Sequence, residues 1–178
     1  MEFLRLPAEE AAVGRYVEAL RVPYQRELQA IIDGFALADD TDVVSAEMDF
    51  QMERLGTESY RIVVAFDPAD DGKSERDIAV ADGNFVGFIA TDIDEAPDVF
   101  DRPDRLLVCD FYVRGSYRGE GLAGELMERA VERAREEGCS ELALDVDVDN
   151  ERALSFYKKV GFETTRNRMT VETSSLSR

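Results

Sequence analysis

Residues 113–124 read Val-Arg-Gly-Ser-Tyr-Arg-Gly-Glu-Gly-Leu-Ala-Gly. The apolar run before them, residues 106–113, predicts a strand, and the spacing of apolar residues after them predicts a helix. That helix would bury Leu122, Leu126, Ala130, Val131 and Ala134. A helix N-terminus leaves backbone N–H groups without intrahelical partners, and small residues there let an anion approach the backbone closely. The stretch therefore predicts a phosphate-binding turn between a strand and a helix.

Other nucleotide-binding patterns fit this turn less well. A P-loop requires a lysine directly after its last glycine, and none follows here. The dinucleotide pattern Gly-x-Gly-x-x-Gly fits Gly119, Gly121 and Gly124, but it belongs on the first strand-to-helix turn of a domain. Here the glycines open the last third of the chain. A different nucleotide-phosphate enzyme and a glycine-rich connection without a ligand are the alternatives to the phosphate site.

The other elements follow from hydrophobic periodicity and from proline and glycine positions. We expect strands at residues 2–6, 60–66, 78–81, 85–93, 106–113, 142–148 and 162–171. We expect helices at residues 7–20, 23–33, 41–55, 122–137 and 151–160. Pro23 would interrupt the first helix, and residues 82–84 would turn a hairpin between residues 78–81 and 85–93. This order predicts an α/β or α+β sheet protein with a single domain at residues 1–173 and a frayed tail at residues 174–178.

Composition restricts the possible partners. The 178 residues include 39 Asp and Glu against 21 Lys and Arg, which gives a formal net charge of −18. Such a surface repels phosphate backbones and anionic lipid, so we expect no nucleic-acid partner and no membrane partner. Only Lys73, Lys158 and Lys159 are lysines, and many carboxylates with almost no lysine are typical of a salt-adapted, haloarchaeal-like protein.

The chemistry-bearing residue types exclude several mechanisms. The chain has no histidine, so it lacks the residue that Ser-His and Cys-His catalytic pairs require. Cys109 and Cys139 form no C-x-x-C pair, so the usual ligands of a zinc site are also missing. Asp145, Asp147 and Asp149 share one strand face, but the spacing does not fit an EF-hand, and we expect no metal. The first residues lack a signal-peptide pattern and no apolar run is long enough to span a membrane, so we expect a cytoplasmic protein.

Two sequence blocks identify a family resemblance. Residues 118–123, Arg-Gly-Glu-Gly-Leu-Ala, fit the pattern Arg/Gln-x-x-Gly-x-Gly/Ala. Residues 150–162, Asn-Glu-Arg-Ala-Leu-Ser-Phe-Tyr-Lys-Lys-Val-Gly-Phe, fit Asn-x-x-Ala-x-x-Phe-Tyr-x-x-x-Gly-Phe. In this order, the two blocks resemble those of the GCN5-related N-acetyltransferase (GNAT) family. The resemblance implies a mixed, mostly antiparallel central sheet of about six to seven strands flanked by about four to five helices.

The resemblance also implies the reaction and the cofactor-binding residues. The reaction is direct transfer of an acetyl group from acetyl-CoA to a primary amine in a ternary complex. Backbone amides would hold the pyrophosphate at Arg118, Gly119, Glu120, Gly121, Leu122 and Ala123. The strand edge at Phe111, Tyr112 and Val113 would pair with the pantetheine arm, and Asn150 would bond to the same arm. No metal is implied.

The catalytic roles implied by the resemblance are a proton donor and a proton acceptor. Tyr157 would lie near the sulfur and protonate the departing thiolate, with burial as a core aromatic as the alternative. Asp110 would accept the proton of the substrate ammonium, directly or through water, with an ion pair to an arginine as the alternative. Strand alternation would place Asp110 on the face of Leu106 and Val108, opposite Cys109.

The acceptor is the least determined part of the prediction. The family's acceptor pocket would lie around residues 20–24 and 35–42. The substrate would be a small-molecule amine or a peptide or protein amino group, and a homodimer is the candidate assembly. A non-catalytic acyl-CoA-binding regulatory module that keeps the turn but lacks the base is the alternative function.

Overall fold

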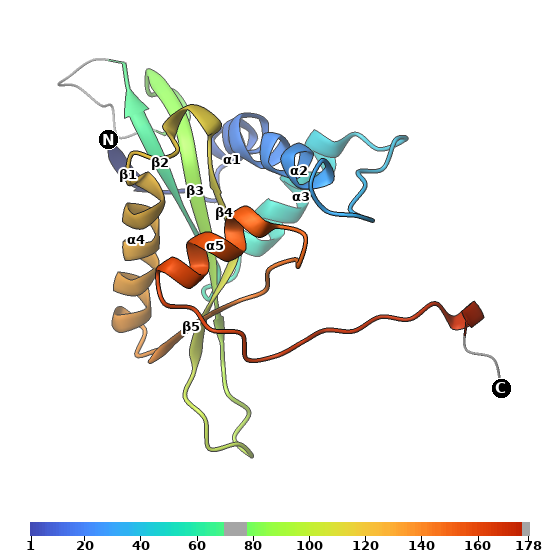
Figure 1. The fold of residues 1–178 in the computed structure, drawn as a ribbon. Helices are drawn as coiled ribbons and strands as arrows, with labels where there is room; N and C mark the ends of the chain where they lie inside the picture. Colours follow the sequence, from blue (N-terminus) through green and yellow to red (C-terminus); the bar gives the residue numbers. More distant parts are fainter. Residues whose placement is uncertain (70–77, 176–178) are drawn as a thin grey trace. The chain divides into compact units, whose positions relative to one another are not determined.

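The structure is a computed structural model that describes residues 1–69 and 78–175 (Figure 1). It contains two compact units, Met1–Asp145 and Val146–Arg178. The single domain expected at residues 1–173 stays a prediction. The connection between the strands expected at residues 60–66 and 78–81 lies mostly outside the described residues.

The first unit is built on one mixed sheet. Its strands are β1 (Glu2–Arg5), β2 (Arg61–Pro68), β3 (Gly83–Asp94), β4 (Arg105–Val113) and β5 (Glu141–Leu144). They lie in the order β1-β2-β3-β4-β5, antiparallel except for the parallel pair β4 and β5. The α+β class and the mostly antiparallel sheet are thus confirmed.

The sheet has fewer strands than the six to seven expected. Residues 78–80 form a turn, and β3 pairs with β2 instead of forming a hairpin with that segment. Among the described residues after 161, the segment 162–171 takes no strand conformation. That segment is almost entirely exposed, so its apolar residues do not gain the burial that a sheet would give them. The sheet therefore has five strands in the described chain.

The first helix is continuous where the sequence predicts a break. α1 (Glu10–Tyr16), the π-helical turn Val17–Arg21 and α2 (Val22–Gln29) follow one another without interruption. Pro23 cannot donate a backbone hydrogen bond to the carbonyl four residues before it, which is that of Ala19. The Ala19 carbonyl instead accepts a hydrogen bond from Arg114 Nη2 at 2.7 Å. The π-helical turn and Arg114 together accommodate Pro23, and the predicted break is wrong.

The remaining helices lie near the expected positions. They are α3 (Val43–Leu55) and α4 (Leu122–Glu136) in the first unit and α5 (Glu151–Lys159) in the second. Asp42 Oδ1 accepts a hydrogen bond from the Ser45 amide at 3.2 Å, and this N-cap explains where α3 begins. Short 3₁₀ turns occupy Gly115–Tyr117 and Thr173–Ser175.

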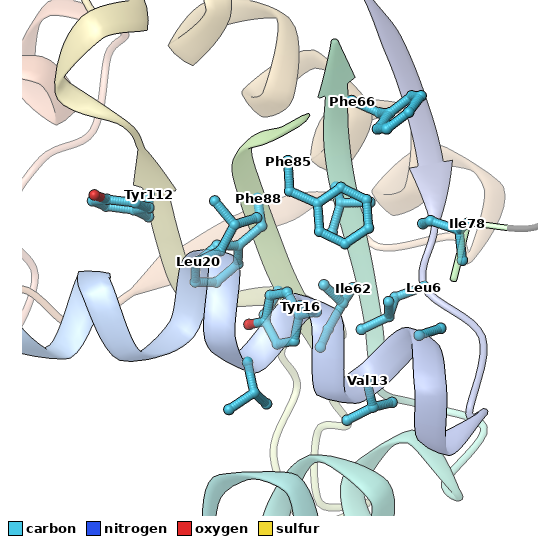
Figure 2. Packing of buried hydrophobic residues seen from close by; sticks show 14 of the residues in the cluster. Leu6, Val13, Tyr16, Leu20, Ile62, Phe66, Ile78, Phe85, Phe88 and Tyr112 are labelled. Carbon is cyan, nitrogen blue, oxygen red and sulfur yellow. The ribbon is translucent and has the colours of Figure 1, made fainter. Parts of the chain in front are cut away.

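The main core lies between the sheet and the first helix (Figure 2). Tyr16 packs edge-on against Phe88 with ring centroids 5.1 Å apart, and Leu20 and Ile62 are fully buried beside them. α1 to α3 cover this face of the sheet, and α4 packs on the other face (Figure 1). β4 therefore lies between helices on the two faces of the sheet, and its residues 109–111 are half-buried.

Candidate active site

The turn between β4 and α4 has the geometry that the sequence predicts. Gly119 and Gly121 have φ values of 86° and 95°, in the left-handed region where glycine is favoured. α4 begins directly after Gly121, and the amides of Gly124 and Glu125 both donate to the Gly121 carbonyl, at 2.8 and 3.2 Å. The amides of residues 119–123 precede these first helical hydrogen bonds. They are the groups that a helix N-terminus offers to an anion.

The glycines of this turn are open to the surroundings. A Cβ atom added to Gly119, Gly121 or Gly124 would meet no atom of the described residues within 4 Å. Backbone conformation accounts for the first two glycines, but Gly124 has no positive φ. Neither packing nor conformation therefore accounts for the absence of a side chain at Gly124. A ligand that approaches the start of α4 closely would require such a position without a side chain.

Arg118 is held beside the turn by contacts that the sequence does not indicate. Its Nε donates to the Val113 carbonyl and its Nη2 pairs with Glu27 Oε2 in α2, both at 2.7 Å. The Tyr112 hydroxyl donates to Glu27 Oε1, also at 2.7 Å. Burial and this bond to Glu27 raise the pKa of Tyr112 to about 12. Glu27 thus connects α2 to both the end of β4 and the turn.

The strand segment expected to bind the pantetheine arm is the part of β4 that extends beyond its pairing with β5. The β4–β5 pairing runs from Arg105 with Glu141 to Val108 with Leu144. β4 continues to Val113, paired on its other side with β3. Phe111, Tyr112 and Val113 therefore follow the last residue of β4 that pairs with β5. An extended ligand could pair with a strand edge of this kind in place of β5.

A β-bulge changes the direction of the Asp110 side chain. Ala90 pairs with Asp110 and Thr91 with Val108, so Cys109 is the extra residue on β4. Arg54 of α3 donates to Cys109 Sγ at 3.7 Å, and Arg21 of the first helix pairs with Asp110 Oδ1 at 2.7 Å. Both side chains therefore face α1 to α3. The prediction that Asp110 lies opposite Cys109 is wrong because simple alternation does not include the bulge.

Asp110 belongs to a buried network of charged groups. Arg21 lies between two carboxylates, with Nη1 2.7 Å from Asp110 and Nε 2.9 Å from Glu47. Gln25 also donates to Glu47, and Arg21 lies over the ring of Tyr24 at 5.6 Å. Burial raises the pKa of Asp110 above its ordinary value, although Arg21 lowers it. The segment 20–24, expected at the acceptor pocket, thus supplies the cation that pairs with Asp110.

Asn150 and Tyr157 lie in the second unit. Asn150 Oδ1 accepts a hydrogen bond from the Ala153 amide at 3.1 Å and caps α5. The half-buried ring of Tyr157 packs edge-on against Phe156 and Phe162, with centroids 5.6 Å away in both cases. The local geometry thus gives Asn150 a role as a helix cap and Tyr157 a place in a small aromatic cluster.

The turn, the end of β4 and the network around Asp110 all lie in the first unit, and their roles as one site stay predictions. Glu27, Arg21 and Glu47 belong to this region as well, but no sequence motif marks them. Within the described ranges, no group of three or more His, Cys, Asp or Glu residues is placed to hold a metal ion. None of the described helices is long and apolar enough to cross a membrane.

The family assignment rests on a match over most of the chain. The model of the acetyltransferase (GNAT) family matches residues 41–162, and the chain therefore belongs to this family. N-alpha-acetyltransferase MAK3 of Arabidopsis thaliana is 46% identical over 46 residues, which are 26% of this chain and 24% of that protein. The chain thus matches only about a quarter of the length of this curated relative.

Solved structures confirm the GNAT fold over nearly the whole chain. A tetramutant of the BH1408 protein from Bacillus halodurans has a TM-score of 0.72 at 15% identity, covering 97% of this chain and 99% of that one. The aminoglycoside N-acetyltransferase AAC(6')-Iy in complex with CoA has a TM-score of 0.63 at 17% identity, covering 97% of this chain and 93% of that one. At these identities the likeness concerns the fold.

Proposed function

We propose that this protein is an acetyl-CoA-dependent N-acetyltransferase that acts on a primary amine. The observation that carries the proposal is the open glycine turn at the start of α4, in a chain that belongs to the GNAT family. The amides of residues 118–123 bind the pyrophosphate, and the β4 edge at residues 111–113 binds the pantetheine arm. Asn150 contributes to the same arm.

The fit of this cofactor to the turn follows from charge as well as space. A chain with a net charge of −18 needs a local source of positive potential to bind a pyrophosphate. Backbone amides at a helix N-terminus supply it without lysine. Arg118 is fixed beside the turn by Val113 and Glu27, and because its charge is paired with the Glu27 carboxylate, the backbone amides remain the main source of positive potential.

The chemistry assigns one proton movement to each of two side chains. Acetyl-CoA supplies the acetyl group as a thioester. Tyr157 donates its phenolic proton to the leaving sulfur, because a phenol remains protonated at neutral pH. Asp110 accepts the proton of the attacking amine through water, and a backbone N–H near Val113 polarises the carbonyl oxygen. The raised pKa of Asp110 makes it a stronger base than an exposed carboxylate.

The acceptor is a small-molecule amine or a peptide or protein amino group. One similar protein is named an N-alpha-acetyltransferase and another an aminoglycoside N-acetyltransferase. Both names describe transfer to nitrogen. This common feature supports an amine as the acceptor class.

One observation favours a non-catalytic acyl-CoA-binding module as the alternative. Asp110 is already paired with Arg21 at 2.7 Å, so its carboxylate is neutralised in the structure. A protein of this kind would bind CoA and release no thiol in the presence of amines.

Isothermal titration with CoA, NAD and ATP tests the cofactor assignment. We expect CoA to bind and Gly121→Ala to weaken it, because a Cβ at this position would crowd the phosphates. Gly138→Ala is the matched control, since Gly138 also has a positive φ and open space around it, at the other end of α4. Equal CoA affinity in both variants would place the phosphates elsewhere, and binding of NAD or ATP without CoA would overturn the assignment.

A further inference from the structure

A pocket lined by arginines lies on the α4 face of the sheet. Its volume is about 230 Å³, and β1, β2, β3 and α4 form its walls. Four arginines line it, namely Arg5, Arg61, Arg129 and Arg133. In a chain with 39 acidic residues, four arginines around one cavity are a marked local reversal of charge.

Three of these arginines have an unused hydrogen-bond donor. The Nε atoms of Arg61, Arg129 and Arg133 are buried and have no hydrogen-bond partner in the residues that the structure describes. A buried donor without a partner is costly, and native proteins rarely keep several of them together. The wall of the pocket therefore contains buried N–H donors that no described residue accepts from.

Arg133 is held rigidly in the wall. Its side chain is only 4% exposed, and Nη1 donates to the Thr91 carbonyl and hydroxyl at 2.9 and 2.6 Å. Nη2 donates to the Ser59 carbonyl. These bonds fix the guanidinium, while Nε lies 3.9 Å from a Glu137 carboxylate oxygen, beyond hydrogen-bond distance.

The acidic residues nearby compensate the arginines only in part. The lining includes Glu132 and Glu136 against the four arginines. Arg129 pairs with Glu132 at 2.6 Å, and Arg61 pairs with Glu137 at 3.1 Å and with Glu136 at 3.9 Å. Burial and the nearby charge of Arg61 lower the pKa of Arg133. With Glu137 included, three carboxylates stand against the four arginines, so an excess of one positive charge remains beside the unused Nε–H donors.

We propose that this pocket is a binding site for a small oxyanion, such as a phosphate group or the carboxylates of a small organic acid. The unused Nε–H groups supply the donors, and the surrounding arginines supply the charge. Arg129 follows Leu122 by seven residues, so the pocket lies about 10 Å along α4 from the glycine turn. This site is separate from the proposed pyrophosphate site and does not depend on it.

Thermal unfolding in inorganic phosphate or in succinate, each compared with NaCl at equal ionic strength, tests the site. We expect at least one of the two anions to raise the Tm of the wild type. Arg129→Gln should weaken that anion's binding by about tenfold or more, because it removes a charge and an Nε–H. Arg105→Gln is the matched control, since Arg105 forms an ion pair with Glu141 on β4 and β5, outside the lining. Stabilisation by phosphate that is lost in Arg129→Gln points to a phosphate ligand, and stabilisation by succinate that is lost in Arg129→Gln points to an organic acid.

The glycine turn could also attract phosphate, so Gly121→Ala belongs in the same series. A stabilisation that survives Gly121→Ala and is lost in Arg129→Gln supports the pocket. Loss in Gly121→Ala with retention in Arg129→Gln, or no stabilisation by either anion, overturns it. NMR adds a local readout, because anion binding should shift the Nε–H resonances of Arg61 and Arg133. Unchanged resonances at a stabilising anion concentration would also contradict the proposal.

Discussion

Asp110 lies where three features of the chain meet. The bulge at Cys109 turns its side chain toward the helices, Arg21 pairs with it, and Glu47 shares the same guanidinium. Removing one member of such a buried group leaves another charge unpaired, which typically costs about 3–5 kcal/mol. The role of Asp110 in proton transfer must therefore be separated from its role in stability.

The pH dependence of kcat/KM distinguishes the role of Asp110 in proton transfer from its role in stability. The basic form of Asp110 accepts the proton, so activity should fall as the pH drops through its raised pKa. Arg21 lowers that pKa, so Arg21→Gln should move the acidic limb of the profile to higher pH. Asp110→Asn should remove this limb and reduce the rate by about 10²- to 10⁴-fold.

Two further variants control this experiment. Arg21→Lys keeps the charge and should move the acidic limb less than Arg21→Gln does. Arg26→Gln removes a charge at an exposed position of α2 outside the network, and it serves as the control for a general change of charge. Circular dichroism confirms that each variant is folded. An acidic limb that stays in place in Arg21→Gln would exclude Asp110 as the proton acceptor.

Tyr157 has a sharper test because its ring can be kept. Tyr157→Phe retains the packing against Phe156 and Phe162 and removes only the hydroxyl. We expect kcat to fall by about 10²-fold or more with little change in CoA affinity, as for loss of a general acid. Phe162→Leu changes the same aromatic cluster and keeps the hydroxyl. Unchanged turnover in Tyr157→Phe would remove this residue from the mechanism.

At the residue scale, sequence reveals local requirements better than distant contacts. Gly119 and Gly121 are identifiable because their spacing and their place before a helix are local properties. Glu27 is not, because it contacts Tyr112 and Arg118 across 85 and 91 residues and is one of 39 acidic residues. No pattern within α2 distinguishes it from its neighbours.

The elements are joined by arginines that bond to main-chain carbonyls. Arg15 of α1 donates to the carbonyls of Ile78, Ala81 and Gly83, at 2.9, 2.8 and 2.7 Å. Its guanidinium also lies over the ring of Phe85 at 4.5 Å. One side chain thus fixes the segment that leads into β3 against the first helix.

Replacement of Arg15 should destabilise this junction. Arg15→Leu removes charged hydrogen bonds to three carbonyls, so we expect the free energy of unfolding to fall by about 3 kcal/mol. Urea unfolding measures the change, and Arg26→Leu on the exposed side of α2 should have an effect within about 0.5 kcal/mol. Equal stabilities of the two variants would show that the Arg15 bonds contribute little.

The elements that the sequence does not predict depend on tertiary contacts. Pro23 is a strong local signal for a break, but Arg114 of the turn after β4 satisfies the carbonyl that Pro23 cannot bond. The bulge at Cys109 is likewise set by the pairing of β3 with β4, and local alternation does not contain it. By contrast, α3 and α4 are predicted within two residues, because apolar periodicity and the glycines at Gly56 and Gly121 are local signals of a helix and its ends.

At the scale of the whole molecule, charge is the main unusual feature. The net charge of −18 implies repulsion between surface carboxylates, which salt screens. We expect Tm to rise steadily in KCl between about 0.1 M and about 2 M, where the Debye length falls from about 10 Å to below 3 Å. KCl is preferable to sulfate, which stabilises most proteins by exclusion from their surface. A flat or falling Tm would contradict salt adaptation.

The GNAT fold was predictable as a whole because two motifs in a fixed order carry more information than periodicity. The strand count was not, because residues 78–80 and 162–171 are β-rich in sequence and do not enter the sheet. Whether a β-rich segment joins the sheet depends on a partner strand and on burial, which are properties of the folded molecule.

Amine-dependent release of thiol from acetyl-CoA tests the central claim most directly. Purified protein in high salt should release free CoA when primary amines or peptides are added, with one acetylated product formed for each thiol. Tyr157→Phe should release much less under the same conditions. CoA binding without thiol release across a broad panel of amines and peptides would contradict the proposed activity and favour the regulatory module.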